Sequence, residues 1–221
     1  MRKTPLVENE YYHIYNRGVD KRNVFLDDRD FSRFLISMNL LNDMEDGAMI
    51  KWRDYKKCVK NANLNHFLKS NFRKREYLVD IVSYCLMSNH YHMILKQKVE
   101  KGIEKFLQKL GTSYTKYFNE KNKRNGALFQ GKFKSSQIKN EGSLSRFSVY
   151  VSCNSEVHKV CAAKSYSWCS FSHHIGKSRD TLARDEEFRG DFRNPKELEE
   201  YAAENIADFQ MRKQDKDMVF E

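Results

Sequence analysis

Apolar residues recur along the chain with two different periods, which predict the order of the secondary-structure elements. Residues 10–16, EYYHIYN, are aromatic and β-branched and predict a first strand. Apolar positions then recur at helical spacing over residues 31–41, behind aspartates that favour a helix N-terminus. Residues 78–97 are strand-like and predict two strands, or one bent strand, on either side of residues 87–89.

The second half of the chain continues this alternation of strands and helices. Residues 100–121 have the amphipathic pattern of a helix, and residues 122–134 form a basic turn with glycines that leads into a short strand ending at Ile138. Residues 142–158 predict a further helix. This order of elements predicts an α+β domain with a mainly antiparallel sheet over residues 1–175.

Two segments stand apart from that pattern. Residues 42–76 are polar, basic and poorly periodic, and we interpret them as an insertion. Residues 176–221 are acidic and contain one expected helix, from the Asn-Pro-Lys-Glu sequence at 194–197 to about residue 213. We interpret this C-terminal helical extension as a solvated tail, with a dimer contact or a lid over the basic surface as alternatives.

Composition limits the classes of protein to which the chain can belong. Of its 221 residues, 40% are hydrophobic and 32% are charged, as in a globular protein. We expect no membrane span and no signal peptide, because no apolar run is long enough and the N-terminus is polar. Five cysteines without a C-x-x-C pair favour reduced thiols in a cytoplasmic protein.

Charge is divided unevenly along the chain, whose net charge is +10. Residues 1–175 contain 31 Lys and Arg against 17 Asp and Glu, whereas residues 176–221 contain 9 against 13. A basic body favours a polyanionic partner, usually a nucleic acid. A protein that is merely basic and soluble is the alternative.

Residues 87–93, MSNHYHM, place two histidines two residues apart. On a strand, His90 and His92 point to the same face, where such a pair is a good bidentate ligand for a divalent metal. Two partly exposed polar residues on a strand are the alternative interpretation.

A third ligand and a nucleophile are found in the helix predicted over residues 142–158. Tyr150 and Asn154 are four residues apart and therefore share a helix face. The amide oxygen of Asn154 suits magnesium or manganese, and a phenol beside such a metal is a plausible nucleophile. The alternative is a core tyrosine and a surface or capping asparagine.

Positive charge concentrates over residues 101–150, which contain 11 Lys and Arg and 3 Asp and Glu. Aromatic residues are interleaved with these charges, as in proteins that bind single-stranded nucleic acid. The candidate DNA-binding residues here are Lys116, Lys123, Arg124, Lys132 and Lys134. We expect Tyr114, Tyr117 and Phe118 to lie on the core side of their helix.

Five segments in order resemble one family. They are YYHIYNRGVDKRNVFLDDRDFSRFL, YCLMSNHYHMIL, YTKYFNEKNKRNGALFQGKFKS, YVSCN and YSWCSF. Together they are similar to the single-tyrosine HUH transposases of the insertion-sequence-200-like superfamily, and most similar to the REP-associated tyrosine transposases. HUH means histidine, hydrophobic residue, histidine, which residues 90–92 fit.

The resemblance implies a fold, a chemistry and a set of site residues. The fold would be a ferredoxin-like antiparallel sheet with helices on one face, and the partner would be single-stranded DNA, often folded as a hairpin. His90, His92 and Asn154 would bind a divalent metal, magnesium or manganese. Tyr150 would form a covalent 5′-phosphotyrosine intermediate. The basic residues that match family positions are Arg17 in YNRG, and Lys132 and Lys134 in GKFK.

Two positions depart from the family pattern, since Ser88 and Ser155 stand where proline is common. The helix is therefore expected to continue past Asn154 and to place His158 on the same face as Tyr150. Three other functions stay open: a domesticated, non-catalytic nucleic-acid-binding regulator, a nuclease that uses water, and a relaxase-type or replication-initiator enzyme. A homodimer and a nucleoid-associated location are further expectations.

Overall fold

A four-stranded antiparallel sheet forms the centre of the computed structural model, which describes residues 5–214. The strands are β1 Tyr11–Arg17, β2 Val79–Met87, β3 His90–Gln97 and β4 Lys134–Ile138. They lie in the order β2-β3-β1-β4, with helical connections after β1 and after β3. This is the ferredoxin-like order, so the expected fold class is confirmed.

The segment expected to hold two strands or one bent strand forms a hairpin. β2 and β3 are joined by the two-residue turn Ser88-Asn89, and Met87 pairs with His90 across it. A turn this short fixes the register and therefore the face to which each side chain points. In β3, the tyrosine, methionine and leucine at 91, 93 and 95 face one hydrophobic core, while Ile94 faces the other.

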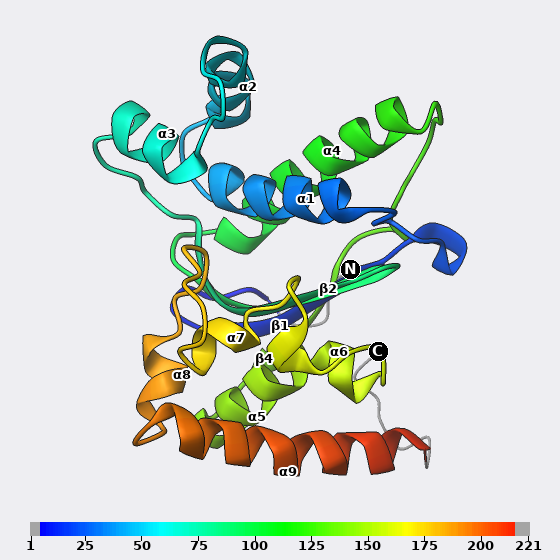
Figure 1. Cartoon of the computed structure of the whole chain (residues 1–221), viewed down its shortest axis with the longest axis vertical. Helices are drawn as coiled ribbons and strands as arrows, with labels where there is room; N and C mark the ends of the chain where they lie inside the picture. The colour runs from blue at the N-terminus through cyan, green and yellow to red at the C-terminus, as the bar shows by residue number, and fades with distance from the viewer. Residues whose placement is uncertain (1–4, 215–221) are drawn as a thin grey trace.

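Two long helices cover the first face of the sheet, α1 Asp28–Leu41 and α4 Gly102–Lys121 (Figure 1). The side chain of Asp27 caps α1 by accepting a hydrogen bond from the backbone of Asp30. Phe34 of α1 and Tyr114 of α4 pack edge to face in the core between the helices and the sheet. As expected, Tyr114 and Phe118 lie on the buried side of α4.

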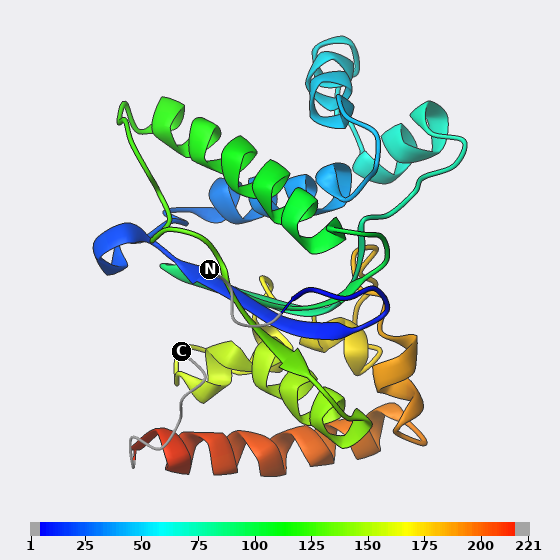
Figure 2. The ribbon, with the colours of Figure 1, turned by 180° about the vertical axis from the view of Figure 1, so that it is seen from behind.

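The C-terminal half of the chain covers the second face of the sheet (Figures 1 and 2). Its helices are α5 Glu141–Ser152, α6 Asn154–Val157, α7 Phe171–His174, α8 Glu186–Gly190 and α9 Pro195–Gln214. The helix expected over residues 142–158 is thus interrupted at Cys153, whose ψ angle of 15° departs from the helical value. The sheet therefore has a helical layer on each side, whereas the resemblance implied helices on one face; that part of the expectation is wrong, because α5 and α6 pack on the second face.

The interpretation of residues 176–221 as a solvated tail is wrong for the described part, which ends at residue 214. α9 packs against α5 and α6, and α8 adds a second helix to the one expected. The buried residues of α9 recur at helical spacing and include Leu198, Ala202, Ile206 and Phe209. The acidic residues between them lie mainly on the other side of the helix, which is why composition alone suggested a tail.

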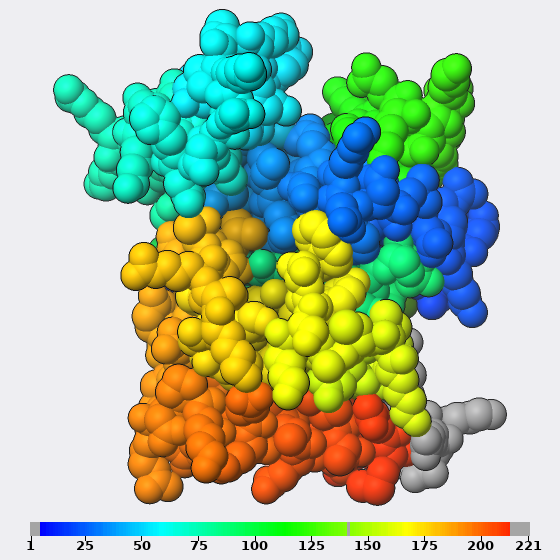
Figure 3. Space-filling view, in the orientation of Figure 1, coloured from blue at the N-terminus to red at the C-terminus, as the bar shows by residue number. Residues whose placement is uncertain are grey.

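Residues 42–76 form a small helical unit with a core of its own. Its helices are α2 Ala48–Cys58 and α3 Leu64–Asn71, and Trp52 and Phe67 pack together between them. Figures 1 and 3 show that this pair projects from the α1 side of the molecule. No helix within residues 5–214 has both the length and the apolar character that a membrane crossing needs.

Candidate active site

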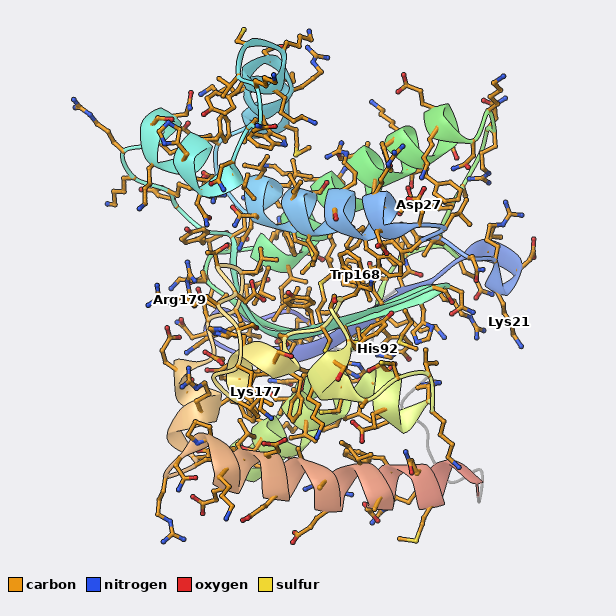
Figure 4. The ribbon with its side chains drawn as sticks, viewed as in Figure 1. Lys21, Asp27, His92, Trp168, Lys177 and Arg179 are labelled. Carbon is orange, nitrogen blue, oxygen red and sulfur yellow. The ribbon has the colours of Figure 1, made fainter. Side chains whose placement is uncertain are left out.

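The two histidines of the H-x-H pair lie on the face of the sheet that α5 and α6 cover, and Figure 4 shows His92 on this side. β1 is the neighbour of β3, and its register pairs Tyr15 with His92 and Arg17 with His90. Directly paired residues in antiparallel strands point to the same face. The same face also carries His13, two residues before Tyr15.

His90 is held by the turn that precedes it. Its Nδ1 lies 2.6 Å from Oδ1 of Asn89, and Asn89 uses its Nδ2 to donate to the carbonyl of Lys21. The amide of Asn89 is therefore oriented with its oxygen toward the ring, so Nδ1 of His90 carries the proton and donates. Nε2 then carries the lone pair, and it lies 3.4 Å from Oδ1 of Asn154.

His92 is held by a second histidine. Its Nδ1 lies 2.8 Å from Nε2 of His13, and the two rings are nearly parallel, with centroids 5.1 Å apart. Both side chains are buried. Burial lowers the pKa of His13 to about 4, because an imidazolium would lose its hydration there. His13 is therefore neutral at pH 7.

Tyr150 and Asn154 approach the histidines from the opposite layer. Tyr150 lies on the last full turn of α5 and Asn154 begins α6, and both are buried. The Tyr150 ring meets the rings of His92 and His13 edge-on, at centroid distances of 5.9 and 6.0 Å. The four residues predicted for catalysis and metal binding therefore meet in one place.

The arrangement fits a cation. Nε2 of His90 and Oδ1 of Asn154 are both lone-pair donors and face each other, and Nδ2 of buried Asn154 has no hydrogen-bond partner among the described residues. A cation between these two donors would bind both. In residues 5–214 no group of three His, Cys, Asp or Glu side chains is placed to hold a metal. A metal here would thus need the asparagine as its third ligand.

The C-terminal extension covers the candidate nucleophile. Phe209 of α9 packs edge-to-face on Tyr150 with ring centroids 5.1 Å apart, and Tyr150 is 1% exposed. His158, which follows α6, lies beside His90 at a centroid distance of 5.6 Å, as its expected position on the Tyr150 face suggested. His158 therefore brings a further imidazole to the site, beside His90.

The predicted DNA-binding residues divide into three groups. Arg17 is exposed on the histidine face, and Lys134 of β4 lies over the Tyr15 ring at 5.7 Å, so both flank the histidines. Lys116 and Lys132 line a groove on the other side of the β4 edge. The remaining two, Lys123 and Arg124, belong to the turn after α4. There Arg124 donates to Asn119 and to the carbonyl of Ala127, a role in closing the turn.

The groove lies between α4 and residues 127–135 and has a volume of about 1390 Å³. Phe129 and Phe133 contribute aromatic surface to it, and Gln108, Thr112 and Thr115 of α4 contribute hydrogen-bonding groups. Figure 2 shows the chain passing from α4 down the sheet edge into β4. The groove and the histidine face are thus connected around the β4 edge, where Lys134 also contributes to the groove wall.

Two other tyrosines that precede the basic turn have structural roles. The hydroxyl of Tyr114 donates to the carbonyl of Val24, and that of Tyr117 donates to Asp30. Burial raises the pKa of both phenols, which makes them poorer nucleophiles. Both lie on α4, across the sheet from the histidines.

Comparison with known proteins agrees with this fold. Residues 49–154 match the family model described as "Transposase IS200 like". A solved structure of a REP-associated tyrosine transposase bound to a REP hairpin matches with a TM-score of 0.51 and 10% sequence identity, over 83% of this chain and 96% of that one. No curated protein sequence matches the chain. The resemblance to the IS200-like transposases that the motifs indicated is therefore confirmed.

Sequence reasoning missed His13, Tyr15 and the polar residues of the groove. The sequence placed His13 and Tyr15 on the first strand, but no local pattern showed that this strand would lie beside the strand that carries His92. The signal available was the alternation itself, since Tyr12 and Ile14 are core residues and the residues between them must face the other way.

Proposed function

We propose that the protein is a metal-dependent transposase that cleaves and rejoins single-stranded DNA containing a hairpin, through a covalent 5′-phosphotyrosine intermediate. One observation carries the proposal. His90 and His92 on β3 meet Tyr150 and Asn154 from the helical layer more than fifty residues later in the chain. A core tyrosine and a capping asparagine would have no reason to face an imidazole pair in this way.

The proposed metal ligands are Nε2 of His90, Nε2 of His92 and Oδ1 of Asn154. A bound divalent ion would polarise the scissile phosphate and offset the charge that develops on it. Two nitrogens and an amide oxygen suit manganese at least as well as magnesium. His90 and His92 would bind as neutral imidazoles, so the full charge of the ion would remain available to the phosphate.

The proposed reaction is an exchange of phosphate esters. The Tyr150 oxygen bonds to phosphorus as its proton passes to solvent, and the bond from phosphorus to the DNA 3′ oxygen breaks, with that oxygen taking up a proton. The 5′ end stays on the tyrosine. In the reverse sense, a 3′-hydroxyl from another strand attacks this linkage and releases the tyrosine, so that no external energy source is needed.

The proposed path of the DNA follows the basic residues. Arg17 and Lys134 would bind phosphates beside the histidines, and Phe129 and Phe133 would stack on unpaired bases in the groove. The solved relative binds a REP hairpin, which supports hairpin DNA as the partner here. A homodimer and a nucleoid-associated cytoplasmic location stay predictions.

One observation favours a second candidate, a non-catalytic DNA-binding regulator of the same fold. Tyr150 is buried under Phe209, so its hydroxyl reaches DNA only if α9 or its neighbours move. A chain that only binds hairpins would need no such movement. The two candidates differ in whether DNA becomes attached to the protein.

A covalent-trapping gel separates the two. Hairpin DNA from the flank of the chain's own gene, labelled at its 3′ end, is incubated with the protein and Mn²⁺ or Mg²⁺, and the mixture is denatured in SDS. The transposase gives a labelled protein band that is lost in chelator and in Tyr150→Phe, but kept in the control Tyr117→Phe. Tight binding without a band indicates the regulator, and nicks without a band indicate a nuclease that uses water.

A further inference from the structure

His13 is a buried titratable side chain that the proposed reaction does not use. It comes from β1, it is 1% exposed, and its Nε2 is 2.8 Å from Nδ1 of His92. The planes of the two rings differ by only 12°, so the hydrogen bond joins two nearly parallel rings that neighbouring strands hold edge to edge. Tyr15, Phe147 and Tyr150 surround the His13 ring and restrict its rotation.

We propose that His13 is the positioning residue for His92, and this proposal rests on the metal-dependent function above. Nδ1–H of His92 donates to Nε2 of His13, which gives Nε2 of His92 the lone pair that a metal requires. The reverse tautomer would protonate Nε2 of His92 and block the ligand. The hydrogen bond thus selects both the tautomer and the direction of the ring.

The same arrangement on the neighbouring ligand supports this assignment. Nδ1 of His90 donates to the side-chain oxygen of Asn89, just as Nδ1 of His92 is paired with His13. Both candidate ligands therefore have Nδ1 held by the protein and present Nε2 as the lone-pair donor.

The test measures binding of Mn²⁺ alone by calorimetry. His13→Phe keeps the ring volume and removes the acceptor, and we expect an affinity about 10- to 100-fold weaker, the usual effect of removing an outer partner. His13→Asn restores an acceptor and should recover part of the loss. His66→Phe, on exposed α3, is the matched control and should bind as the wild type does.

Ring ¹⁵N chemical shifts of His92 give a readout that a merely structural role would not change. We expect the tautomer protonated at Nδ1 in wild type with metal, and a mixture in His13→Phe. Wild-type affinity in both His13 variants, with an unchanged His92 tautomer, overturns the role of His13 and leaves the proposed function intact. Failure of the wild type to bind Mn²⁺ overturns both.

A second, independent observation concerns the α2–α3 unit. Residues 51–75 contain nine Lys and Arg and a single acid, Asp54, which pairs with Arg53 and Lys57. Six exposed cations have no acidic partner among the described residues: Lys51, Lys56, Lys60, Lys69, Arg73 and Lys74. We call these six the insertion surface. Such a charge density on one small projecting unit attracts phosphate.

We propose that the insertion surface binds the backbone of the double-stranded stem of the hairpin DNA. The aromatic side chains of the unit are packed and are therefore not available to stack on bases. Trp52 and Phe67 form the unit's core, and Tyr55 and Phe72 pack against that core. The groove beside α4, by contrast, offers Phe129 and Phe133 together with lysines. Without stacking surfaces the insertion surface fits paired DNA, and the groove fits unpaired bases.

Fluorescence anisotropy with labelled hairpins tests this division. Lys56, Lys60, Lys69 and Lys74 are changed together to Gln. The same change at Lys159, Lys164, Lys177 and Lys196, in the C-terminal half that covers the second face of the sheet, is the charge-matched control. For a hairpin with a long stem, the slope of log affinity against log salt should fall by about 0.9 for each phosphate that the variant no longer neutralises. Affinity for an unpaired strand of the same length should stay within about twofold of the wild-type value.

Equal effects of the two quadruple variants, or equal losses of affinity for stem and unpaired strand, overturn the insertion surface as a stem-binding site. Formation of the covalent adduct with an unchanged salt slope would leave the proposed function standing without it. A wild type that binds no hairpin overturns both.

Discussion

The two faces of the sheet are made by the same strands and serve different purposes. Toward α1 and α4, alternate residues of β1 and β3 are apolar, and they form a continuous core with aromatic helix residues. Toward α5 and α6, the intervening residues include His13, Tyr15, His90 and His92. Because successive side chains of a strand point to opposite faces, the same strands supply core residues on one face and candidate site residues on the other.

Among the residues that the structure describes, the second face carries unsatisfied buried polar groups and the first face carries none. Among the described residues, buried side-chain atoms without a hydrogen-bond partner include Oγ of Ser83, Ser148 and Ser155, and Nδ2 of Asn154. All four lie on β2, α5 or α6. Each such group costs about 1–3 kcal/mol. This comparison indicates that the α5 layer is built around a site at the expense of stability, whereas the α1–α4 layer is built for packing.

The largest effect should come from the packed face. Phe34 is fully buried and contacts Phe25, Tyr91 and Tyr114, so Phe34→Ala should lower the free energy of unfolding by about 3–5 kcal/mol. Urea denaturation measures this change. A loss below about 1 kcal/mol would contradict the assignment of this face to packing.

On the face that α5 and α6 cover, His90→Ala should weaken metal binding rather than lower stability. Loss of one of three ligands should weaken Mn²⁺ binding by at least about 100-fold, more than loss of an outer partner. The free energy of unfolding without metal should change little, since His90 is half-buried. Calorimetry with and without Mn²⁺ checks both, and unchanged metal affinity would rule out His90 as a ligand.

A substitution in the groove should weaken DNA binding without changing metal binding. Phe129→Leu keeps most of the apolar packing and removes the stacking surface, so affinity for a hairpin with an unpaired flank should fall by about 1–3 kcal/mol. Mn²⁺ affinity should stay at the wild-type value. A parallel loss of metal binding would mean that the variant disturbs the sheet rather than the groove.

Acid should loosen the attachment of the C-terminal layer. His174 is buried between Asp185 and Ser170, and burial lowers its pKa below the ordinary 6.5. Below pH 6.5, His174 therefore binds a proton more readily in the unfolded chain than in the folded protein. The free energy of unfolding should fall as pH drops through this range. His174→Asn should reduce this slope between pH 7.5 and 5.0 in urea denaturation. An unchanged slope would show that His174 does not titrate on unfolding.

The smallest effect should come from Ser148, whose buried hydroxyl has no partner in the described structure. Ser148→Ala removes a desolvated polar atom and should leave stability unchanged or raise it by up to about 1 kcal/mol. A clear loss, by contrast, would show that this hydroxyl is bonded in solution and would weaken the contrast between the faces.

The sequence was sufficient wherever a pattern is local. The first strand, the strand-like character of residues 78–97 and the helix expected over residues 100–121 follow from periodicity, and the spacing of Tyr150 and Asn154 places both on one side of their helical layer. The packing of α9 on Tyr150 was not predictable in this way, because acidic residues outnumber the apolar ones that make the contact. The partnership of His13 with His92 depends on strand order, which no local pattern encodes.

The central claim is that Tyr150 forms the covalent bond to the DNA, and mass spectrometry of the trapped adduct tests it most directly. After nuclease and trypsin digestion, the account predicts a nucleotide phosphate on Tyr150, within the peptide of residues 147–159. The same mass on a peptide containing Tyr114 or Tyr117, or no modified peptide despite cleavage in Mn²⁺, would contradict it.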